Sequence, residues 1–404
     1  MSEVRRLRSL STVVQSPAIL TEDSFAATRL TSLDLLRGVT IAAMILVNNP
    51  GNDHPYWPLE HAEWNGWTPT DLVFPFFLFM VGVSLVFSFE SRLRRGDSKR
   101  LLLLHAFRRG ITIFAIGLAM NYIPHLLSPS SFPGVRIPGV LQRIGICYPF
   151  ASILFLYVRP RTRLAVVAAL LIGYWILMRF VPVPGYGLPG RDIPFLHPDA
   201  NLDSYLDRKF LRVLWEKTRD PEGLLSTLPA IATPLLGIFA GEWLRSKGSP
   251  QRKVLGILWF GVLGLVMGRT WAIWFPINKK LWTSSFVLFT AGAALVCLAL
   301  CYWAADIKRW RAVGPNGILS KPFLIFGRNA ITAYIAAWVF AVLPYFVTFK
   351  VDGEKQHLAE YVFERFFAPL GSPSFASLLF SLAFVLLCLI PIWLLDRKKV
   401  FLKI

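Results

Sequence analysis

The chain has 404 residues, 54% of them hydrophobic, and a mean hydropathy of +0.51. This composition excludes an ordinary soluble globule, because apolar stretches of roughly 20 residues, enough to cross a bilayer as a helix, recur along the chain. The formal net charge of +19 does not indicate nucleic-acid binding, because Lys and Arg gather in short segments between the apolar stretches.

The apolar stretches predict an all-α, polytopic membrane helical bundle of about ten transmembrane helices. They lie at 33–49, 70–89, 101–122, 138–158, 163–181, 227–244, 253–271, 281–303, 322–348 and 374–395. A basic segment follows every second span, whereas the loop at 50–69 has no Lys or Arg. The positive-inside rule therefore places the N- and C-termini in the cytoplasm. We expect a cytoplasmic segment at 1–28 and one transmembrane domain at 29–404, with an external loop at 182–226.

The first span carries Asp34 and Arg37 three residues apart on one helix face, where they can pair. One interpretation is an ion pair at the headgroup level of the cytoplasmic side. The other is that Arg37 meets a phosphate that enters from the cytoplasm, with Asp34 holding the guanidinium in place. Charged groups in a span are costly and so often mark a functional site.

The external segment after the first span is rich in residues that can do chemistry. Thr68, Pro69 and Asp71 form a helix-start pattern, with Asp71 at the capping-box position, so we interpret Asp71 first as a cap and second as a functional acid. His61 can exchange a proton near neutral pH. Its neighbours Asn48, Glu63 and Asn65 are candidates to orient it.

Two histidines compete for the catalytic role in this segment, His61 and His54, and spacing alone does not choose between them. A loop histidine is often an ordinary surface residue. The nearby Trp57, Trp64 and Trp67 favour a site, since aromatic faces often line sugar-binding pockets.

Later spans contain further polar residues. Arg108 and Arg109 lie about two turns into the third span, deeper than anchoring requires, and we expect at least one to face a polar cavity. Gln142 and Arg143 lie about one turn into the fourth span, as a structural hydrogen-bond cluster or as ligand contacts. Arg328 and Asn329 resemble that pair, although Gly327 can mark a bend at which they satisfy neighbouring carbonyl groups. The four cysteines lie in apolar spans without metal-site spacing, so no metal is expected.

With these residues the chain resembles the heparan-α-glucosaminide N-acetyltransferase family, including bacterial NagX-like transmembrane acyltransferases. The run from His61-Ala62-Glu63-Trp64-Asn65-Gly66 to Asp71-Leu72-Val73-Phe74-Pro75 is the specific part of the match. The supporting motifs are Asp34-Leu35-Leu36-Arg37-Gly38, Val47-Asn48, Arg136-Ile137-Pro138-Gly139-Val140-Leu141-Gln142-Arg143 and Gly327-Arg328-Asn329.

The resemblance implies transfer of an acetyl group from cytosolic acetyl-CoA, a co-substrate, to the amino group of a glucosamine-type sugar or glycan across a bacterial inner membrane. It places His61 and Asn48 at the catalytic positions. We assign Arg37, Arg109 and Asp34 to the CoA end, and Trp64, Asn65, Gln142, Arg143 and Asn329 to the acceptor. The resemblance also suggests a homodimer in the lipid bilayer, with no nucleic-acid partner.

Two mechanisms remain open from sequence: His61 as general base on the acceptor amine, or His61 as a covalent acetyl carrier. Asn48 is a candidate oxyanion donor in both. The alternative function is a transporter of N-acetylglucosamine or related amino sugars, which a polar-lined bundle also serves. A non-catalytic scaffold would leave the buried Arg and Asn residues unexplained.

Overall fold

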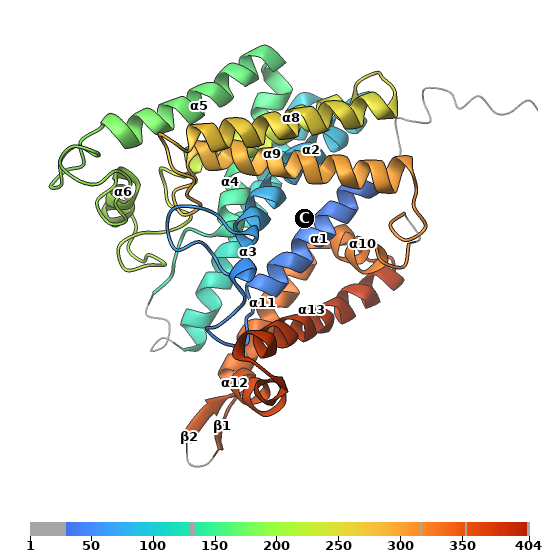
Figure 1. Cartoon of the computed structure of the whole chain (residues 1–404). Helices are drawn as coiled ribbons and strands as arrows, with labels where there is room; N and C mark the ends of the chain where they lie inside the picture. Colours follow the sequence, from blue (N-terminus) through green and yellow to red (C-terminus); the bar gives the residue numbers. More distant parts are fainter. Residues whose placement is uncertain (1–29, 129–133, 315–316, 352–353, 402–404) are drawn as a thin grey trace, which may run out of the picture.

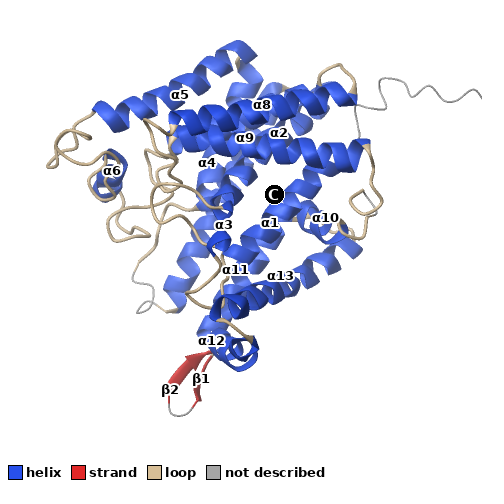
Figure 2. Ribbon diagram, viewed as in Figure 1, coloured by secondary structure: helices blue, strands red, loops and turns tan. Residues whose placement is uncertain are grey.

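The computed structural model describes residues 30–128, 134–314, 317–351 and 354–401, and in these ranges the regular secondary structure is helical apart from one short hairpin (Figures 1 and 2). The expected cytoplasmic segment 1–28 lies outside the described residues. The long helices are α1 (Thr31–Val47), α2 (Val73–Arg94), α3 (Lys99–Leu127), α4 (Val140–Tyr157), α5 (Pro160–Phe180), α7 (Thr227–Arg245), α8 (Pro250–Trp271), α9 (Ser284–Cys301), α11 (Ala330–Phe346) and α13 (Pro373–Arg397).

Shorter elements complete the described fold. They are the 3-10 turns Trp57–Leu59, Pro69–Leu72 and Ala368–Leu370, the helices α6 (Leu202–Phe210), α10 (Lys321–Arg328) and α12 (Leu358–Val362), the π-helical turns Tyr302–Ile307 and Phe363–Phe367, and the strands β1 (Thr348–Val351) and β2 (Glu354–His357). The two strands pair antiparallel.

The prediction of a polytopic helical bundle is confirmed, and each expected span coincides with a helix. Within the described residues, eight helices are long and apolar enough to cross a membrane, and α10 with α11 forms a ninth candidate that is bent by 94°. The remaining expected span is α1, which has 17 residues and is shorter than these. The expected span at 322–348 is thus a broken helix, with its break at Asn329.

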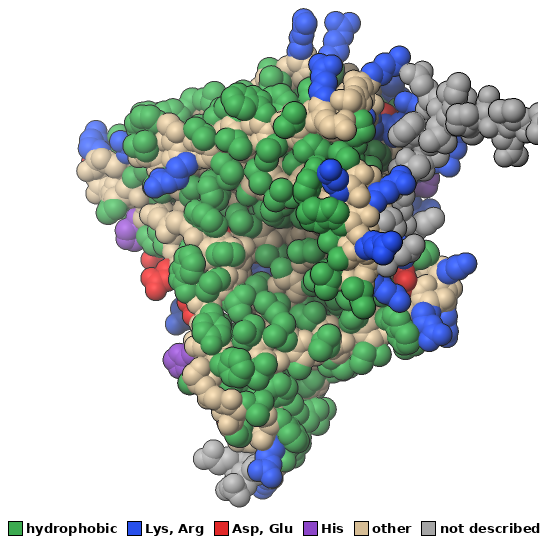
Figure 3. Space-filling view, turned by 45° about the vertical axis from the view of Figure 1, so that its right-hand side comes forward, with side chains coloured by type: hydrophobic (Ala, Val, Ile, Leu, Met, Phe, Trp, Pro, Cys, Tyr) green, Lys and Arg blue, Asp and Glu red, His purple; other side chains and the backbone are tan. Residues whose placement is uncertain are grey.

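Burial separates inner from outer helices. Most of α2, α4, α7 and α9 is buried, whereas α8 and α13 expose leucines such as Leu255 and Leu386. A space-filling view shows a broad apolar surface, with most visible Lys and Arg side chains towards one side of the molecule (Figure 3). A protein whose surface is apolar as well as its core is suited to contact with lipid.

Helices α1 and α10 approach each other with glycine at the contact. A Cβ added to Gly38 would lie 1.7 Å from the carbonyl oxygen of Phe323, and one added to Gly327 would lie 1.9 Å from that of Asp34. Only glycine permits this approach, which holds the broken helix against α1.

The loop at 182–226, called the external loop after its expected position, folds over one end of the bundle and contains α6 (Figure 1). This helix begins at Leu202 and ends at Phe210. Arg136, which precedes α4, forms ion pairs with Asp220 and Glu222 of the loop. These pairs fasten the loop beside the first turn of α4.

Candidate active site

A cavity of about 560 Å³ opens between the end of α1, the start of α2, the external loop and α11. Its walls include residues from each of these elements and from the segment between α8 and α9. The lining residues used below are Asn48, His61, Trp64, Asp71, Glu222 and Lys279. The structure therefore gathers residues up to 290 positions apart in sequence, from Met44 to Tyr334, around one space.

His61 and Asp71 form a hydrogen-bonded pair in this cavity. Nδ1 of His61 lies 2.7 Å from Oδ1 of Asp71, whose side chain is 1% exposed, whereas the His61 side chain is 45% exposed. A carboxylate only accepts, so the proton of the neutral imidazole lies on Nδ1. The lone pair of Nε2 is then available for chemistry, as in an acid–base residue oriented by a carboxylate.

Asp71 also holds the loop that carries His61. Its Oδ2 accepts hydrogen bonds from the backbone N–H of Ala62 at 3.1 Å and of Thr68 at 3.0 Å. Pro69 lies at the first position of the 3-10 turn, as predicted, and the capping box is formed. The predicted cap is therefore confirmed, and the same carboxylate contacts His61, whereas its role as a functional acid stays a prediction.

Lys279 is the residue of this cavity that the sequence reasoning missed. Its Nζ lies 2.9 Å from Nδ1 and 3.2 Å from Nε2 of His61, and 3.5 Å from Oδ1 of Asp71. Burial lowers the pKa of Lys279, and the charge of Asp71 acts in the opposite direction. The signal in the sequence was the positive charge of this segment. Lys279 and Lys280 are basic residues between α8 and α9, on the side expected to be external, where the loop at 50–69 has no Lys or Arg.

Asn48 and Trp64 lie where the sequence placed them, in the same cavity as His61. Asn48 ends α1, and its backbone N–H donates to Met44. Trp64 donates from Nε1 to the carbonyl of Leu196, and the guanidinium of Arg219 lies 4.6 Å from its ring centre. These contacts fix the indole at the wall of the cavity.

Asn65 does not line the cavity but clamps two of its segments. Its Oδ1 accepts a hydrogen bond of 3.3 Å from Asn278, next to Lys279. The neighbouring Gly66 donates its N–H to the carbonyl of Ile277 at 2.8 Å. The loop of His61 and the segment of Lys279 are thus joined directly.

His54 lies away from this arrangement. It is exposed, and its backbone N–H donates to the side chain of Asn52. Unlike His61, it is not among the residues that line the cavity. Geometry therefore favours His61 over His54.

Arg37 and Asp34 form the predicted pair, at 3.1 Å, near the other end of α1. Arg37 also donates to the carbonyl of Gly327 at 3.2 Å and to the hydroxyl of Ser84 at 2.7 Å. The pair thus joins α1, α2 and α10. Eleven residues of helical rise separate Arg37 from Asn48, about 16 Å along the helix axis.

Arg109 does not line the cavity of His61. Its side chain is exposed, as is that of Arg108, and its guanidinium lies 5.1 Å from the ring centre of Tyr148. The reason is the contact between α3 and α4, which uses the small residue Gly110 against Gly145 and so turns both arginines away. Neither arginine lines the cavity of His61, so a cavity-facing arginine on this helix stays a prediction.

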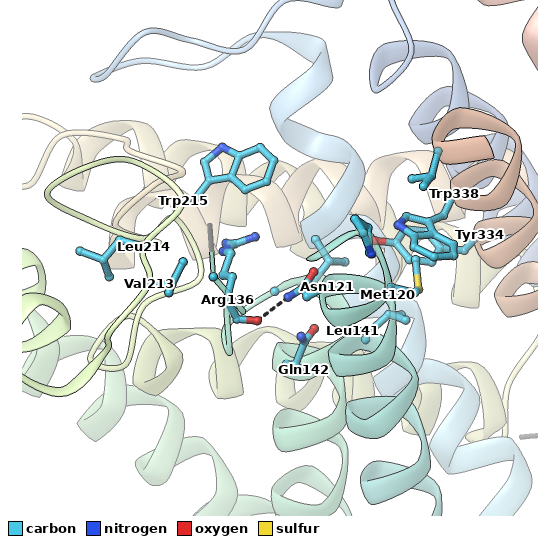
Figure 4. A pocket seen from close by; sticks show the side chains of 16 residues that line it. Met120, Asn121, Arg136, Leu141, Gln142, Val213, Leu214, Trp215, Tyr334 and Trp338 are labelled. Atoms are coloured by element: carbon cyan, nitrogen blue, oxygen red, sulfur yellow. Dashed lines mark hydrogen bonds between the residues drawn. The ribbon is translucent and has the colours of Figure 1, made fainter. Parts of the chain in front are cut away.

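Gln142 lines a second cavity, of about 580 Å³, which shares Arg136, Val140, Trp215 and Tyr334 with the first (Figure 4). The side chain of Gln142 is 3% exposed, and its Nε2 has no hydrogen-bond partner within the described residues. Most of the other lining side chains are apolar, including Met120, Leu141, Val213, Leu214 and Trp338.

Arg143 and Asn329 are buried outside both cavities. Arg143 donates to the hydroxyl of Ser226 at 2.7 Å and to the carbonyl of Gly223, and so ties α4 to the external loop. Asn329 lies at the break between α10 and α11, 2% exposed, with no partner for its side-chain amide within the described residues.

Comparisons with known proteins identify the family to which the chain is similar. The family model for the catalytic region of heparan-alpha-glucosaminide N-acetyltransferase matches residues 29–278. The heparan-alpha-glucosaminide N-acetyltransferase of Homo sapiens is 31% identical over 385 residues, which cover 83% of this chain and 57% of the relative. The Mus musculus protein of the same name is 31% identical over 359 residues, 77% of this chain and 53% of the relative. The chain thus spans about half the length of these relatives.

Proposed function

The chain belongs to the heparan-alpha-glucosaminide N-acetyltransferase family, and we propose that it is a transmembrane acetyltransferase. The donor is cytosolic acetyl-CoA, and the acceptor is the amino group of a glucosamine-type sugar or glycan on the periplasmic side of a bacterial inner membrane. One observation carries the proposal: a histidine oriented by a buried carboxylate, Asp71, lines a cavity that also contains Asn48 and Trp64.

The chemistry follows from the free nitrogen of His61. As the acceptor amine attacks the thioester carbonyl carbon, Nε2 takes a proton from the amine nitrogen. The C–S bond then breaks, and the same proton passes from Nε2 to the departing sulfur, so His61 returns to its neutral form. In the alternative order, Nε2 itself attacks the carbonyl carbon and the C–S bond breaks, so that CoA leaves as the thiolate. The amine then attacks the acetyl group, the bond to Nε2 breaks, and the amine proton goes to the thiolate. Asp71 holds the same tautomer in both.

Asn48 is the proposed donor to the carbonyl oxygen, which gains negative charge in the transition state. Trp64 offers an aromatic face at the wall of the cavity for the acceptor ring. Asn65 and Arg143 hold cavity segments in place, and we assign them a supporting role.

For the donor, we propose that Arg37, held by Asp34, lies at the anionic end of CoA, about 16 Å along α1 from the reacting end. Arg109 is a second candidate contact for that end, from the exposed face of α3. Gln142 and Asn329 are candidate contacts along the path between the two ends, because buried amides without partners are costly.

The test is acetyl transfer by the purified full chain in lipid nanodiscs, with free CoA thiol and acetylated glucosamine measured together. We expect acceptor-dependent CoA release by the wild type. The His61→Ala variant should lose a factor of about 10² to 10⁴ in rate. His54→Ala is the matched control in the same loop and should retain the wild-type rate. A His61→Ala protein that is folded and fully active would refute the assignment.

The broken helix α10–α11 also favours transport as a second candidate, since discontinuous helices form substrate sites in many transporters. The two functions predict different products in sealed proteoliposomes. A transporter would accumulate labelled N-acetylglucosamine without acetyl-CoA. The acetyltransferase would instead require acetyl-CoA and release free CoA.

A further inference from the structure

Lys279 contacts the reacting group of the proposed enzyme, yet neither the sequence motifs nor the matched family region, which ends at residue 278, include it. Its Nζ lies 3.2 Å from Nε2 of His61, the nitrogen that has to exchange a proton. Its side chain is 19% exposed, so the ammonium is largely enclosed while it lines the cavity.

The segment that carries Lys279 is held firmly to the loop of His61. Asn278 donates from its side chain to Asn65, and its backbone N–H donates to the hydroxyl of Thr283 at 3.0 Å. The side chain of Asn278 also accepts the N–H of Leu281 at 2.9 Å. The base of the Lys279 side chain is therefore positioned by the fold, and its flexible stem leaves the ammonium free to move by a few ångströms.

Charge balance for Asp71 is the simplest alternative role for Lys279. Asp71 already accepts hydrogen bonds from His61 and from the backbone N–H groups of Ala62 and Thr68. Its oxygens therefore have partners without Lys279, which lies 3.5 Å away. Enclosing an ammonium group in the protein disfavours its charged form. Placing Lys279 here only to add one more partner to Asp71 would therefore contribute little to stability.

We propose that Lys279 is a catalytic residue whose ammonium stabilises the negative charge on the thioester carbonyl oxygen; this rests on the acetyl transfer proposed above. When the amine nitrogen bonds to the carbonyl carbon, the C=O electron pair moves to oxygen, where Lys279 faces it. When the C–S bond breaks, the pair returns and C=O reforms. Lys279 keeps its proton throughout, and the proton taken by His61 goes to sulfur.

The resting contact fits this role. In the structure the ammonium lies against the imidazole ring, 2.9 Å from Nδ1 and 3.2 Å from Nε2, and a substrate that binds to Nε2 displaces it by a short distance. The charged groups that face it are Asp71, Glu222 and Lys280, with His61 against its head. Glu222 is itself paired with Arg136. The displaced cation therefore remains beside the reacting carbonyl group.

The experiment compares Lys279→Met, which keeps the length and removes the charge, with Lys279→Arg, which keeps the charge. Lys217→Met is the matched control, because Lys217 is exposed on the external loop. The measurements on the full chain in nanodiscs are kcat and KM for acetyl-CoA and glucosamine, the pH profile of kcat, and thermal stability.

We expect Lys279→Met to lose a factor of about 10² to 10³ in kcat, as for other removed oxyanion donors, with KM values changed less than about threefold. Lys279→Arg should recover at least part of that loss and should extend activity to higher pH, because guanidinium stays protonated there. A folded Lys279→Met protein with wild-type kcat would overturn the proposal, as would a loss confined to KM or matched by Lys217→Met. If the wild type itself transfers no acetyl group, the proposed function fails, and the role of Lys279 falls with it.

Discussion

Replacing Asp71 with Asn is the smallest change that separates the two roles of this side chain. The shape is retained, but one carboxylate oxygen becomes an amide NH₂ group. Oδ2 accepts two backbone N–H bonds, from Ala62 and Thr68, so the amide oxygen has to take that position. The NH₂ group then faces Nδ1 of His61 and donates to it.

The consequence is a change of tautomer. With Nδ1 as acceptor, the proton of the neutral imidazole moves to Nε2, which can no longer take a proton from the amine or attack a carbonyl. We expect the Asp71→Asn variant to lose a factor of about 10² to 10⁴ in kcat, the range of general acid–base catalysis. Thermal stability should change little, because both backbone bonds remain.

Asp71→Ala would be a poorer test, because it leaves two backbone donors without their acceptor at a site that is 1% exposed. Each such loss costs about 1 to 3 kcal/mol, so the variant should be destabilised as well as inactive. The assay is CoA release with glucosamine as acceptor, beside a thermal melt of each protein. Asp53→Asn, on the exposed part of the same loop, is the control. Asp71→Asn with more than about a third of wild-type kcat would refute the tautomer reasoning.

Two further predictions concern the fold. Gly38→Ala should lower thermal stability and yield, because its Cβ would lie 1.7 Å from a backbone oxygen of α10, whereas Gly173→Ala, with open space around the added carbon, should not. Burial raises the pKa of Asp207, in α6 of the external loop, to about 6, above its unfolded value near 3.8. The folded state therefore favours the protonated carboxyl group of Asp207. This contribution to the stability of the fold is fully present below about pH 4 and is lost as pH rises through 6, so proteolysis of the loop should increase from pH 5 to 7. Asp207→Asn should remove this pH dependence, and an unchanged dependence would contradict it.

Much of the fold was predictable because a bilayer imposes length and composition on each span. All ten expected segments coincide with helices, and the cap at Thr68–Asp71 was evident from local spacing. The break near Asn329 was only hinted at by Gly327, since a 94° bend depends on packing against α1.

The candidate site was predictable only in its local part. His61, Asn48 and Trp64 lie in one sequence segment and in one cavity. Lys279 is 218 residues from His61, and no local pattern reports such a contact. Arg109 shows a second limit of the sequence. Its position along the helix follows from the sequence, but the direction of its side chain depends on which face of α3 packs against α4.

In the proposed function, the two ends of α1 join a cytosolic donor to an external acceptor. Arg37 lies near one end, in contact with α2 and α10, and Asn48 ends the helix at the cavity of His61. The roughly 16 Å between them is a distance that an extended, flexible arm of CoA has to cover inside the bundle, where polar groups need partners. Asn329, with an unpartnered buried amide at the break of α10–α11, lies two residues from the carbonyl that Arg37 contacts. A helix broken at that point exposes backbone groups to an entering polar ligand, which an unbroken span would not do. The break and the pair Asp34–Arg37 are therefore best understood together, as the proposed entrance of the path that ends at His61.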